Sequence, residues 1–332
     1  MKKYNVAVVG ATGLVGQTFL KVLKERKFPV EKLYLYASKK SAGKKVTFNG
    51  EEYTVIELKD ENIKNDIDIA LFSAGGSISK EYAPKFRDKG AIVVDNSSAW
   101  RMDKDIPLVV PEANSEALKD QKGIIANPNC STIQVMPVLK VLSDNYGLKR
   151  VVYSTYQAVA GSGQKGIEDL EANLKGEKSK NYPYQIAFNL LPHIDVFLEN
   201  GYTKEEIKMI EETRKILGLP NLKVTATCVR VPVRMGHAVS VNVELEKAFD
   251  LKDIFKLFEK KDGIIVKDDV SKNIYPMPIE AEDTDEVYVG RIRRDESLEN
   301  GLNLWVVADN IRKGAATNTI QIAESLIEKG VI

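Results

Sequence analysis

Short apolar runs alternate with amphipathic stretches through the first 130 residues of the chain. Residues 5–10 are a run of valines that ends in glycine, and Val15, Phe19, Val22 and Leu23 then recur at i, i+4, i+7 and i+8. This spacing is typical of a helix that packs on a sheet. Further apolar runs lie at residues 33–37, 67–72, 91–94 and 123–126. Runs of this length between polar or helical stretches predict an α/β, Rossmann-type, doubly wound parallel sheet.

The pattern changes in the second part of the chain. Five segments there alternate or are rich in β-branched residues, and several are neighbours in sequence: 151–159, 224–233, 238–245, 287–292 and 302–308. They predict a mostly antiparallel sheet, covered by helices at 166–174 and 204–217. We therefore expect a second domain of the α+β class.

The helical spacing of residues 315–329 places Ile320, Ala323 and Leu326 on one face. We expect this last helix to return to the first domain. The predicted domains are residues 1–128 plus 313–332 and residues 129–312. Residues 176–200 have weak periodicity with several aromatic side chains, which predicts a packed loop or an interface.

Composition excludes several classes of protein. The chain has 332 residues, 43% of them hydrophobic and 29% charged, which is typical of a folded chain of about two domains. With 48 basic and 47 acidic residues, it offers no basic stripe for nucleic acid. No apolar run approaches the roughly 18 to 20 residues of a membrane span. The apolar stretch near the start, residues 6–9, is shorter than the roughly 7 to 15 residues that a signal peptide needs. We expect a cytoplasmic protein.

The two cysteines, Cys130 and Cys228, are too few for a disulfide framework. His193 and His237 lie far apart, and the cysteines and histidines lack the close spacing of a zinc site, so no metal site is predicted.

A glycine-rich turn follows the first predicted strand. Its glycines, Gly10, Gly13 and Gly16, are spaced G-x-x-G-x-x-G and open an amphipathic helix. Such a turn brings backbone N–H groups at a helix N-terminus to a pyrophosphate, although glycines in this pattern also occur in turns without a ligand. The strand–turn–helix context predicts a dinucleotide, with these residues in the site: Gly10, Thr12, Gly13, Leu14, Val15 and Gly16.

The end of the second predicted strand decides between the two nicotinamide dinucleotides. Where an NAD site usually has an acidic residue, this chain has Ser38, Lys40 and Ser41, which suit a 2′-phosphate. NADP is therefore favoured over NAD, unless the lysines there are a solvated loop. Ser73 and Gly75 follow the third strand and are further candidates for cofactor binding.

Cys130 lies just after a predicted strand and at the start of a predicted helix. The partial positive charge of a helix N-terminus favours the thiolate, so Cys130 is a candidate nucleophile. Pro137 predicts a kink or a later helix start. Cys228, in an alternating run, is better explained as a buried small residue.

These blocks together resemble the aspartate-semialdehyde dehydrogenase family over nearly the whole chain. The resemblance is carried by the following segments and residues: 10–16, 97–101, 129–134, 156–159, Arg230 and His237. It implies reversible, NADP-dependent conversion of aspartate 4-semialdehyde and phosphate to 4-aspartyl phosphate, an oxidoreductase reaction in lysine, threonine and methionine biosynthesis. It also implies that the α+β domain is the catalytic and dimerisation domain of a homodimer or tetramer. The expected binding partners are these small molecules.

The resemblance assigns roles to individual residues. Cys130 is the nucleophile that forms a thioester, His237 the general acid and base with a pKa near neutrality, and Gln157 orients the intermediate. Gly161 and Asn310 are implied in cofactor binding.

The resemblance also implies substrate-binding residues. Arg230 is expected to hold the substrate carboxylate, Arg101 and Lys208 the phosphate, and Glu206 the substrate ammonium, with Asn129 assisting. Without the family, Glu206 and Lys208 would be read as an exposed helix face.

Two departures from the family pattern affect the cofactor. Lys40 stands where arginine is frequent, which relaxes the preference for NADP toward NAD. Residues 160–163 read Ala-Gly-Ser-Gly in place of the more usual Ser-Gly-Ala-Gly. Neither departure removes a predicted catalytic group.

Three other functions remain open from the sequence. N-acetyl-glutamyl-phosphate reductase uses the same thioester chemistry, but its acylated substrate has no ammonium for an acidic residue. Malonyl-CoA reductase on the same scaffold would need room for coenzyme A. A non-catalytic NADP sensor would not need Cys130.

Overall fold

The computed structural model describes residues 2–332, and the chain divides into two compact units. Unit 1 comprises Met1–Pro128 with Ala315–Ile332, and unit 2 comprises Asn129–Gly314. Unit 2 is thus one continuous stretch of chain, whereas unit 1 is assembled from both ends. The second boundary lies two residues after the one expected from the sequence.

A six-stranded parallel sheet forms the centre of unit 1. Its strands are paired in the order β5-β2-β1-β6-β7-β8. Their bounds are β1 (Tyr4–Val9), β2 (Val30–Ala37), β5 (Ile56–Glu57), β6 (Ile69–Phe72), β7 (Ile92–Asp95) and β8 (Ile124–Ala126). The chain leaves β1 toward β2 on one side and reaches β6 on the other, so the carboxyl ends of β1 and β6 flank the switch point where ligands of such sheets bind. The predicted doubly wound parallel sheet is confirmed.

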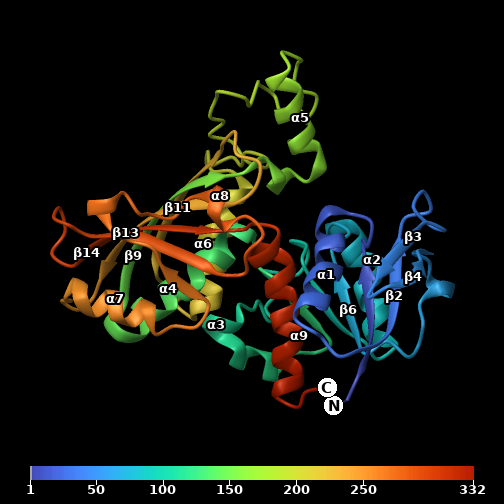
Figure 1. Cartoon of the computed structure of the whole chain (residues 1–332). Helices are drawn as coiled ribbons and strands as arrows, with labels where there is room; N and C mark the ends of the chain where they lie inside the picture. Colours follow the sequence, from blue (N-terminus) through green and yellow to red (C-terminus); the bar gives the residue numbers. More distant parts are fainter. Residues whose placement is uncertain (1) are drawn as a thin grey trace. The chain divides into compact units, whose positions relative to one another are not determined.

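Helices cover both faces of this sheet (Figure 1). Their bounds, with those of the short turns and of a separate antiparallel hairpin, are α1 (Leu14–Glu25), α2 (Gly76–Asp88), α3 (Pro111–Asn114), α9 (Asn318–Glu328), η1 (Asp60–Asn62), η2 (Ser115–Asp120), β3 (Lys45–Phe48) and β4 (Glu51–Thr54). The hairpin β3–β4 was not predicted. On the α2 face, Phe86 makes edge-to-face contacts with Tyr36 and Phe72.

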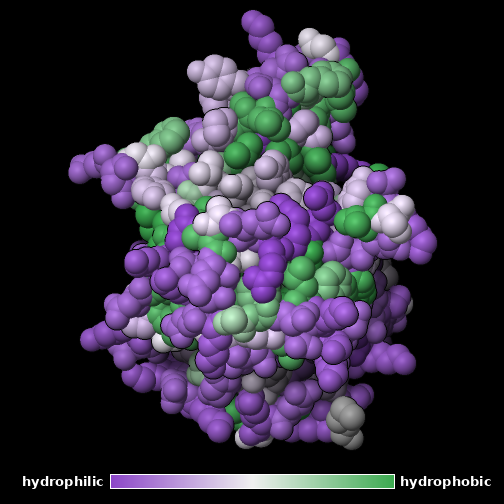
Figure 2. Space-filling model, turned by 90° about the vertical axis from the view of Figure 1, so that its left-hand side faces the viewer, coloured by the Kyte–Doolittle hydropathy of each residue, from purple (hydrophilic) through white to green (hydrophobic). Residues whose placement is uncertain are grey.

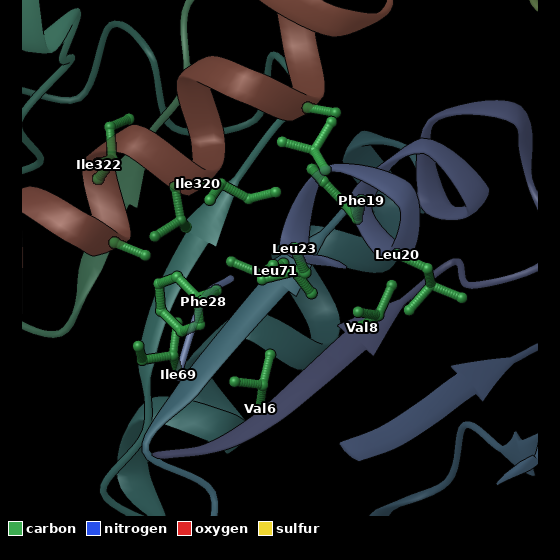
Figure 3. Close-up of a cluster of buried hydrophobic side chains, with 14 of the residues drawn as sticks. Val6, Val8, Phe19, Leu20, Leu23, Phe28, Ile69, Leu71, Ile320 and Ile322 are labelled. Atoms are coloured by element: carbon green, nitrogen blue, oxygen red, sulfur yellow. The ribbon is translucent and has the colours of Figure 1, made fainter. Parts of the chain in front are cut away.

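The last helix, α9, completes the core on the other face of unit 1. One buried cluster (Figure 3) contains Ile320 and Ile322 of α9, Phe19 and Leu23 of α1, and Leu71 of β6. A π-helical turn, η5 (Arg312–Thr317), precedes α9, so the regular helix begins later than residue 315.

Unit 2 contains a mixed six-stranded sheet with the order β10-β9-β11-β14-β13-β12. Its strands are β9 (Leu148–Gln157), β10 (Lys223–Arg230), β11 (His237–Leu245), β12 (Ile264–Val266), β13 (Val287–Asp295) and β14 (Gly301–Ala308). The three central pairings are antiparallel, and the pairings of β10 with β9 and of β12 with β13 at the two edges are parallel. The predicted mostly antiparallel sheet is confirmed.

Helices pack against one face of this sheet. The helices and turns of unit 2 are α4 (Cys130–Tyr146), η3 (Val159–Ser162), α5 (Gln164–Leu174), α6 (Lys204–Leu217), α7 (Leu251–Glu259), η4 (Val270–Lys272) and α8 (Pro278–Ala281). Along β9, Val151 and Tyr153 are fully buried, whereas the alternate residues Val152 and Tyr156 are partly exposed on the opposite face. Helix α4 begins at Cys130 and continues through Pro137, so a later start is wrong.

Two features are absent from residues 2–332. No helix there has both the length and the apolar character needed to span a membrane. No group of three or more His, Cys, Asp and Glu side chains in that range could hold a metal ion.

Candidate active site

Close backbone contacts shape the glycine turn of unit 1. Gly10 has φ +88°, and a Cβ atom there would lie 2.2 Å from the carbonyl oxygen of Ser73. A Cβ atom on Gly16 would lie 2.2 Å from the carbonyl oxygen of Gly10. Gly13 caps α1 without a side-chain hydrogen bond, and the first turn of α1 has no acidic residue. The helix end is therefore suited to an anion.

The other predicted cofactor residues of unit 1 lie at the same edge of the sheet. Ser38 and Ser41 follow β2 in a turn closed by a hydrogen bond from Ser41 N–H to Ser38 O of 2.8 Å. Thr12 Oγ1 lies 3.3 Å from Ser41 Oγ, which joins this turn to the glycine turn. Lys40 is exposed beside them. Beyond β6, Gly75 caps α2, again with φ +88° and without a side-chain cap.

Arg101 lies in a loop after β7, also in unit 1. Its side chain is buried and donates from Nε to Ser97 O at 3.0 Å and from Nη2 to Asn96 O at 3.0 Å. The guanidinium is therefore held by the backbone of its own loop.

In unit 2, Cys130 is the first residue of α4 and is partly exposed. The side chain of the N-cap residue Asn129 does not cap the helix. Its Oδ1 instead accepts from Cys130 Sγ at 3.5 Å. The thiol therefore lies at the positive end of the helix, as expected for an activated nucleophile.

His237, the first residue of β11, is completely buried. Its Nδ1 accepts the backbone N–H of Ala158 at 3.0 Å, so in the neutral imidazole the proton is on Nε2. Among the described residues Nε2 has no hydrogen-bond partner. Burial and then the charge of Arg230 lower the pKa of His237 well below its ordinary value. His237 is thus a neutral hydrogen-bond donor at neutral pH.

Arg230 ends β10 close to His237. Its Nη1 donates to Ala158 O at 2.7 Å, while its buried Nε has no partner within the part of the chain that the structure describes. A Cβ atom on Gly161 would lie 2.6 Å from Arg230 Nη1 and 3.3 Å from His237 Nε2. Glycine at position 161 therefore lets the chain pass directly over both donors.

A chain of polar contacts links Gln157 to α6. Gln157 Oε1 accepts from Thr155 Oγ1 at 2.9 Å, and its Nε2 donates to Glu205 Oε1 at 3.1 Å. Glu205 Oε2 accepts from Lys208 Nζ at 3.1 Å, and Lys208 also donates to Asp195 at 2.8 Å. Burial would raise the pKa of Glu205, but Lys208 and Gln157 lower it overall, so the carboxylate stays ionised.

Contacts between neighbouring elements hold these residues of unit 2 together. Both Arg230 and His237 bind the backbone of Ala158, which follows Gln157 directly. Gln134, one turn after Cys130 on α4, donates to the carbonyl oxygen of His237 at 3.3 Å. Cys130, the two buried donors and the polar cluster of Gln157, Glu205, Lys208 and Asp195 therefore belong to one assembly.

Comparisons with known proteins agree with this arrangement. Residues 5–121 match the model of a semialdehyde dehydrogenase NAD binding domain, and residues 139–313 match that of a semialdehyde dehydrogenase dimerisation domain. The aspartate-semialdehyde dehydrogenase of Aquifex aeolicus is 60% identical over 99% of this chain and 99% of its own length. The chain belongs to the semialdehyde dehydrogenase family.

Solved structures of the semialdehyde dehydrogenase family have the same fold. That of aspartate semialdehyde dehydrogenase II from Vibrio cholerae, complexed with ASA, has a TM-score of 0.95 and 47% identity, covering 99% of each chain. That of the Candida albicans enzyme with NADP has a TM-score of 0.81 and 28% identity, covering 100% of each chain.

The structure corrects the role expected for Glu206 in this semialdehyde dehydrogenase. Glu206 Oε2 accepts the N–H of Thr203 at 2.7 Å while Thr203 caps the N–H of Glu206, a reciprocal capping box. Glu206 Oε1 accepts the N–H of Cys228 at 3.0 Å. Since both oxygens bind backbone amides, Glu206 has a structural role, and the carboxylate in the polar cluster is that of its neighbour Glu205.

The expected pKa of His237 near neutrality is also wrong, because the residue is buried beside Arg230 and lacks a carboxylate partner among the described residues. Cys228, by contrast, is fully buried as the sequence indicated, and burial raises the pKa of its thiol.

The roles of Gly161 and Asn310 toward a cofactor remain predictions. Asn310 Oδ1 accepts the N–H of Gly236, and its buried Nδ2 has no partner within residues 2–332.

Sequence reasoning missed three acidic residues of this site: Glu205, Asp195 and Glu212. One signal could have separated Glu205 from Glu206, because the pattern Thr203-x-x-Glu206 is a capping box and identifies Glu206 as the N3 residue. The spacing of Glu205, Lys208 and Glu212 at i, i+3 and i+7 then places them on one helix face. No local signal points to Asp195, which reaches Lys208 from the segment before α6.

Proposed function

We propose that this chain is an NADP-dependent aspartate-semialdehyde dehydrogenase that interconverts aspartate 4-semialdehyde plus phosphate and 4-aspartyl phosphate through a thioester on Cys130. The observation that carries the proposal is the position of Cys130 at the start of α4, in one assembly with His237 and Arg230, two buried donors that each have a nitrogen without a partner in residues 2–332. A relative that is 60% identical over 99% of this chain is named aspartate-semialdehyde dehydrogenase.

Cys130 begins the reaction in the oxidative direction. The thiolate sulfur adds to the aldehyde carbon, forming a C–S bond and leaving the electron pair of the C=O bond on oxygen. His237 Nε2–H donates to this oxygen, which is the role left to an imidazole whose Nδ1 accepts a backbone N–H. The neutral state of His237 fits a donor that stabilises an oxyanion.

NADP supplies the hydride acceptor for the oxidative direction and the hydride donor for the reverse. The residues of unit 1 fit this cofactor, since the uncapped start of α1 suits a pyrophosphate and the exposed Lys40 with Ser38 and Ser41 suits a 2′-phosphate. With a hydride acceptor bound, the adduct on Cys130 would become a thioester whose C=O bond is restored.

Three buried side chains, those of Arg230, Glu205 and Gln157, suit different groups of the substrate. Arg230, whose guanidinium is fixed by Ala158, suits the α-carboxylate. Glu205 is the acceptor for the substrate ammonium, in place of Glu206. Gln157, held between Thr155 and Glu205, orients the acyl group beside the sulfur.

Lys208 is the cation that binds phosphate in unit 2. The carboxylates of Glu205 and Asp195 raise its pKa against the effect of burial, so it stays charged. A phosphate oxygen attacks the thioester carbon, and the C–S bond breaks with its electron pair returning to Cys130 as thiolate. The role of Arg101 toward phosphate stays a prediction.

A homodimer formed through unit 2 completes the proposal. Five large apolar side chains of the segment between α5 and α6 are exposed, with Phe188 at 89%: Tyr184, Phe188, Leu190, Val196 and Phe197. Figure 2 shows apolar side chains gathered in its upper part, at the height of α5 in Figure 1. This supports an interface more than a lid for residues 176–200.

Turnover of aspartate 4-semialdehyde with NADP or NAD, with and without phosphate, tests the function. We expect phosphate-dependent reduction of NADP by wild type and a loss of at least about 10³-fold in Cys130→Ser. Cys228→Ser is the matched control, because Cys228 is buried and should leave turnover unchanged. Activity retained in Cys130→Ser, or no turnover by folded wild type, contradicts the proposal, and malonyl-CoA and N-acetyl-glutamyl phosphate would be tested next.

A further inference from the structure

Four residues of α6 lie on one face of the helix. Glu205, Lys208, Met209 and Glu212 are spaced at i, i+3, i+4 and i+7 and span about 10 Å of the helix axis. Glu205 and Lys208 belong to the polar cluster described above. Met209 and Glu212 instead contact the beginning of α4, so this face of α6 joins the polar cluster to the segment that contains Cys130.

Met209 and Glu212 hold the beginning of α4 and the residue before it at three points. Glu212 Oε2 accepts the backbone N–H of Asn129 at 2.7 Å. Met209 Sδ lies 3.7 Å from Asn129 Nδ2 and 3.5 Å from Thr132 Oγ1. Helix α6 is itself attached to β9, because the hydroxyl groups of Thr213 and Tyr153 are 2.9 Å apart.

The contact between Glu212 and Asn129 is unusual for a helix start. An N-cap side chain normally binds the amides of its own helix, but Asn129 turns its Oδ1 to the thiol of Cys130 instead. The N–H of Asn129 is satisfied from a different helix by a carboxylate that is 1% exposed. A buried negative charge next to the residue that precedes Cys130 acts strongly on a thiolate there.

We propose that Glu212 is a positioning residue for the nucleophile: its carboxylate holds the backbone of Asn129 and opposes formation of the thiolate on Cys130. The inference rests on the proposed function in taking Cys130 as the nucleophile. A more acidic thiol gives more thiolate, but the nucleophilicity of that thiolate is lower. The carboxylate of Glu212 keeps the acidity of the Cys130 thiol between these two effects. Glu212 offsets part of the stabilisation that the start of α4 gives to the thiolate.

The pH dependence of Cys130 alkylation by iodoacetamide tests this proposal on the whole protein. We expect Glu212→Gln to shift the midpoint of the alkylation rate to lower pH by about 0.5 to 1 unit, because glutamine can accept the same N–H without the charge. Glu212→Asp keeps the charge and should leave the midpoint within about 0.2 unit of wild type. Glu211→Gln is the matched control, because Glu211 is a partly exposed neighbour on α6 that pairs with Arg214. Mass spectrometry of the labelled peptide separates Cys130 from Cys228.

The two parts of the proposal have separate readouts. Glu212→Ala removes both charge and hydrogen bond, and should shift the midpoint as Glu212→Gln does while lowering turnover at least about tenfold further. An unshifted or raised midpoint in folded Glu212→Gln overturns the proposal, as does an equal shift in Glu212→Asp. Alkylation needs no turnover, so these outcomes remain distinct from a failure of the proposed reaction, which Cys130→Ser reveals.

Discussion

The glycine turn of unit 1 and the polar cluster of unit 2 are built in different ways. The turn is made of backbone: Gly10 and Gly16 allow peptide groups to approach where a single Cβ atom would lie 2.2 Å from a carbonyl oxygen. The cluster is made of side chains, in which Gln157, Glu205 and Lys208 are held by one another.

This difference determines what each region tolerates. A backbone site loses its shape when one methyl group is added, whatever the charge of the new residue. A side-chain site keeps its shape after an isosteric change but loses charge, so its binding chemistry changes first. Stability measurements should therefore report on the turn, and kinetic measurements on the cluster.

The largest expected effect is the loss of stability in Gly10→Ala. Gly10 and Gly75 share φ +88°, but a Cβ atom on Gly75 meets no atom within 4 Å. Alanine at position 75 should therefore cost only the backbone strain, about 1–2 kcal/mol of unfolding free energy. Gly10→Ala should cost about 4 kcal/mol or more, because a backbone carbonyl must also move. Equal thermal unfolding midpoints for the two variants would show that the close approach is unimportant.

The next effect compares two adjacent carboxylates. Glu205→Gln should lower kcat/KM for aspartate 4-semialdehyde about 100-fold with little loss of stability, because it removes the charge beside Lys208 and the substrate ammonium. Glu206→Gln should keep kcat/KM within about threefold but lower the unfolding free energy by about 1–2 kcal/mol, since it weakens the capping box. Steady-state kinetics and thermal unfolding of both variants decide the assignment, and the reverse pattern would restore Glu206 to the substrate site.

The smallest expected effect is the pH dependence that His237 gives to stability. Its pKa is lowered in the folded chain, so the unfolded chain binds more protons below about pH 6.5 and stability falls as the pH falls. Between pH 7 and 5.5, wild type should lose roughly 1 kcal/mol more unfolding free energy than His237→Gln, which has no proton to bind at this position. Parallel loss in both proteins would mean that the imidazole is not held neutral. Denaturant titrations at the two pH values measure the difference.

The elements and the glycine turn could be predicted from the sequence because they depend on local patterns. The spacing of apolar residues predicted α6 at its observed bounds, Lys204–Leu217, and the glycines indicated the turn. The start of α4 at Cys130 followed from the strand and helix around it.

The partners of the polar cluster could not be predicted in the same way. Asp195 reaches Lys208, and Glu212 reaches Asn129, from segments 13 and 83 residues away in the sequence. The neutral state of His237 depends on the burial and on the neighbouring Arg230, which only the packing of β10, β9 and β11 creates. Composition gives no access to such long-range contacts.

The return of the chain to unit 1 has a consequence for how the protein is made. Arg26 pairs with Glu324 at 2.6 Å, and Tyr4 donates to the carbonyl oxygen of Ile332 at 3.2 Å, so the two segments that make up unit 1 are bound to each other. Unit 2 has its whole sequence once Gly314 has been added, whereas Phe19 and Leu23 lack their cover until α9 leaves the ribosome. Premature termination before α9 therefore yields a chain with an exposed apolar surface, which chaperones and proteases recognise. The core of unit 1 can therefore close only after α9 has been synthesised.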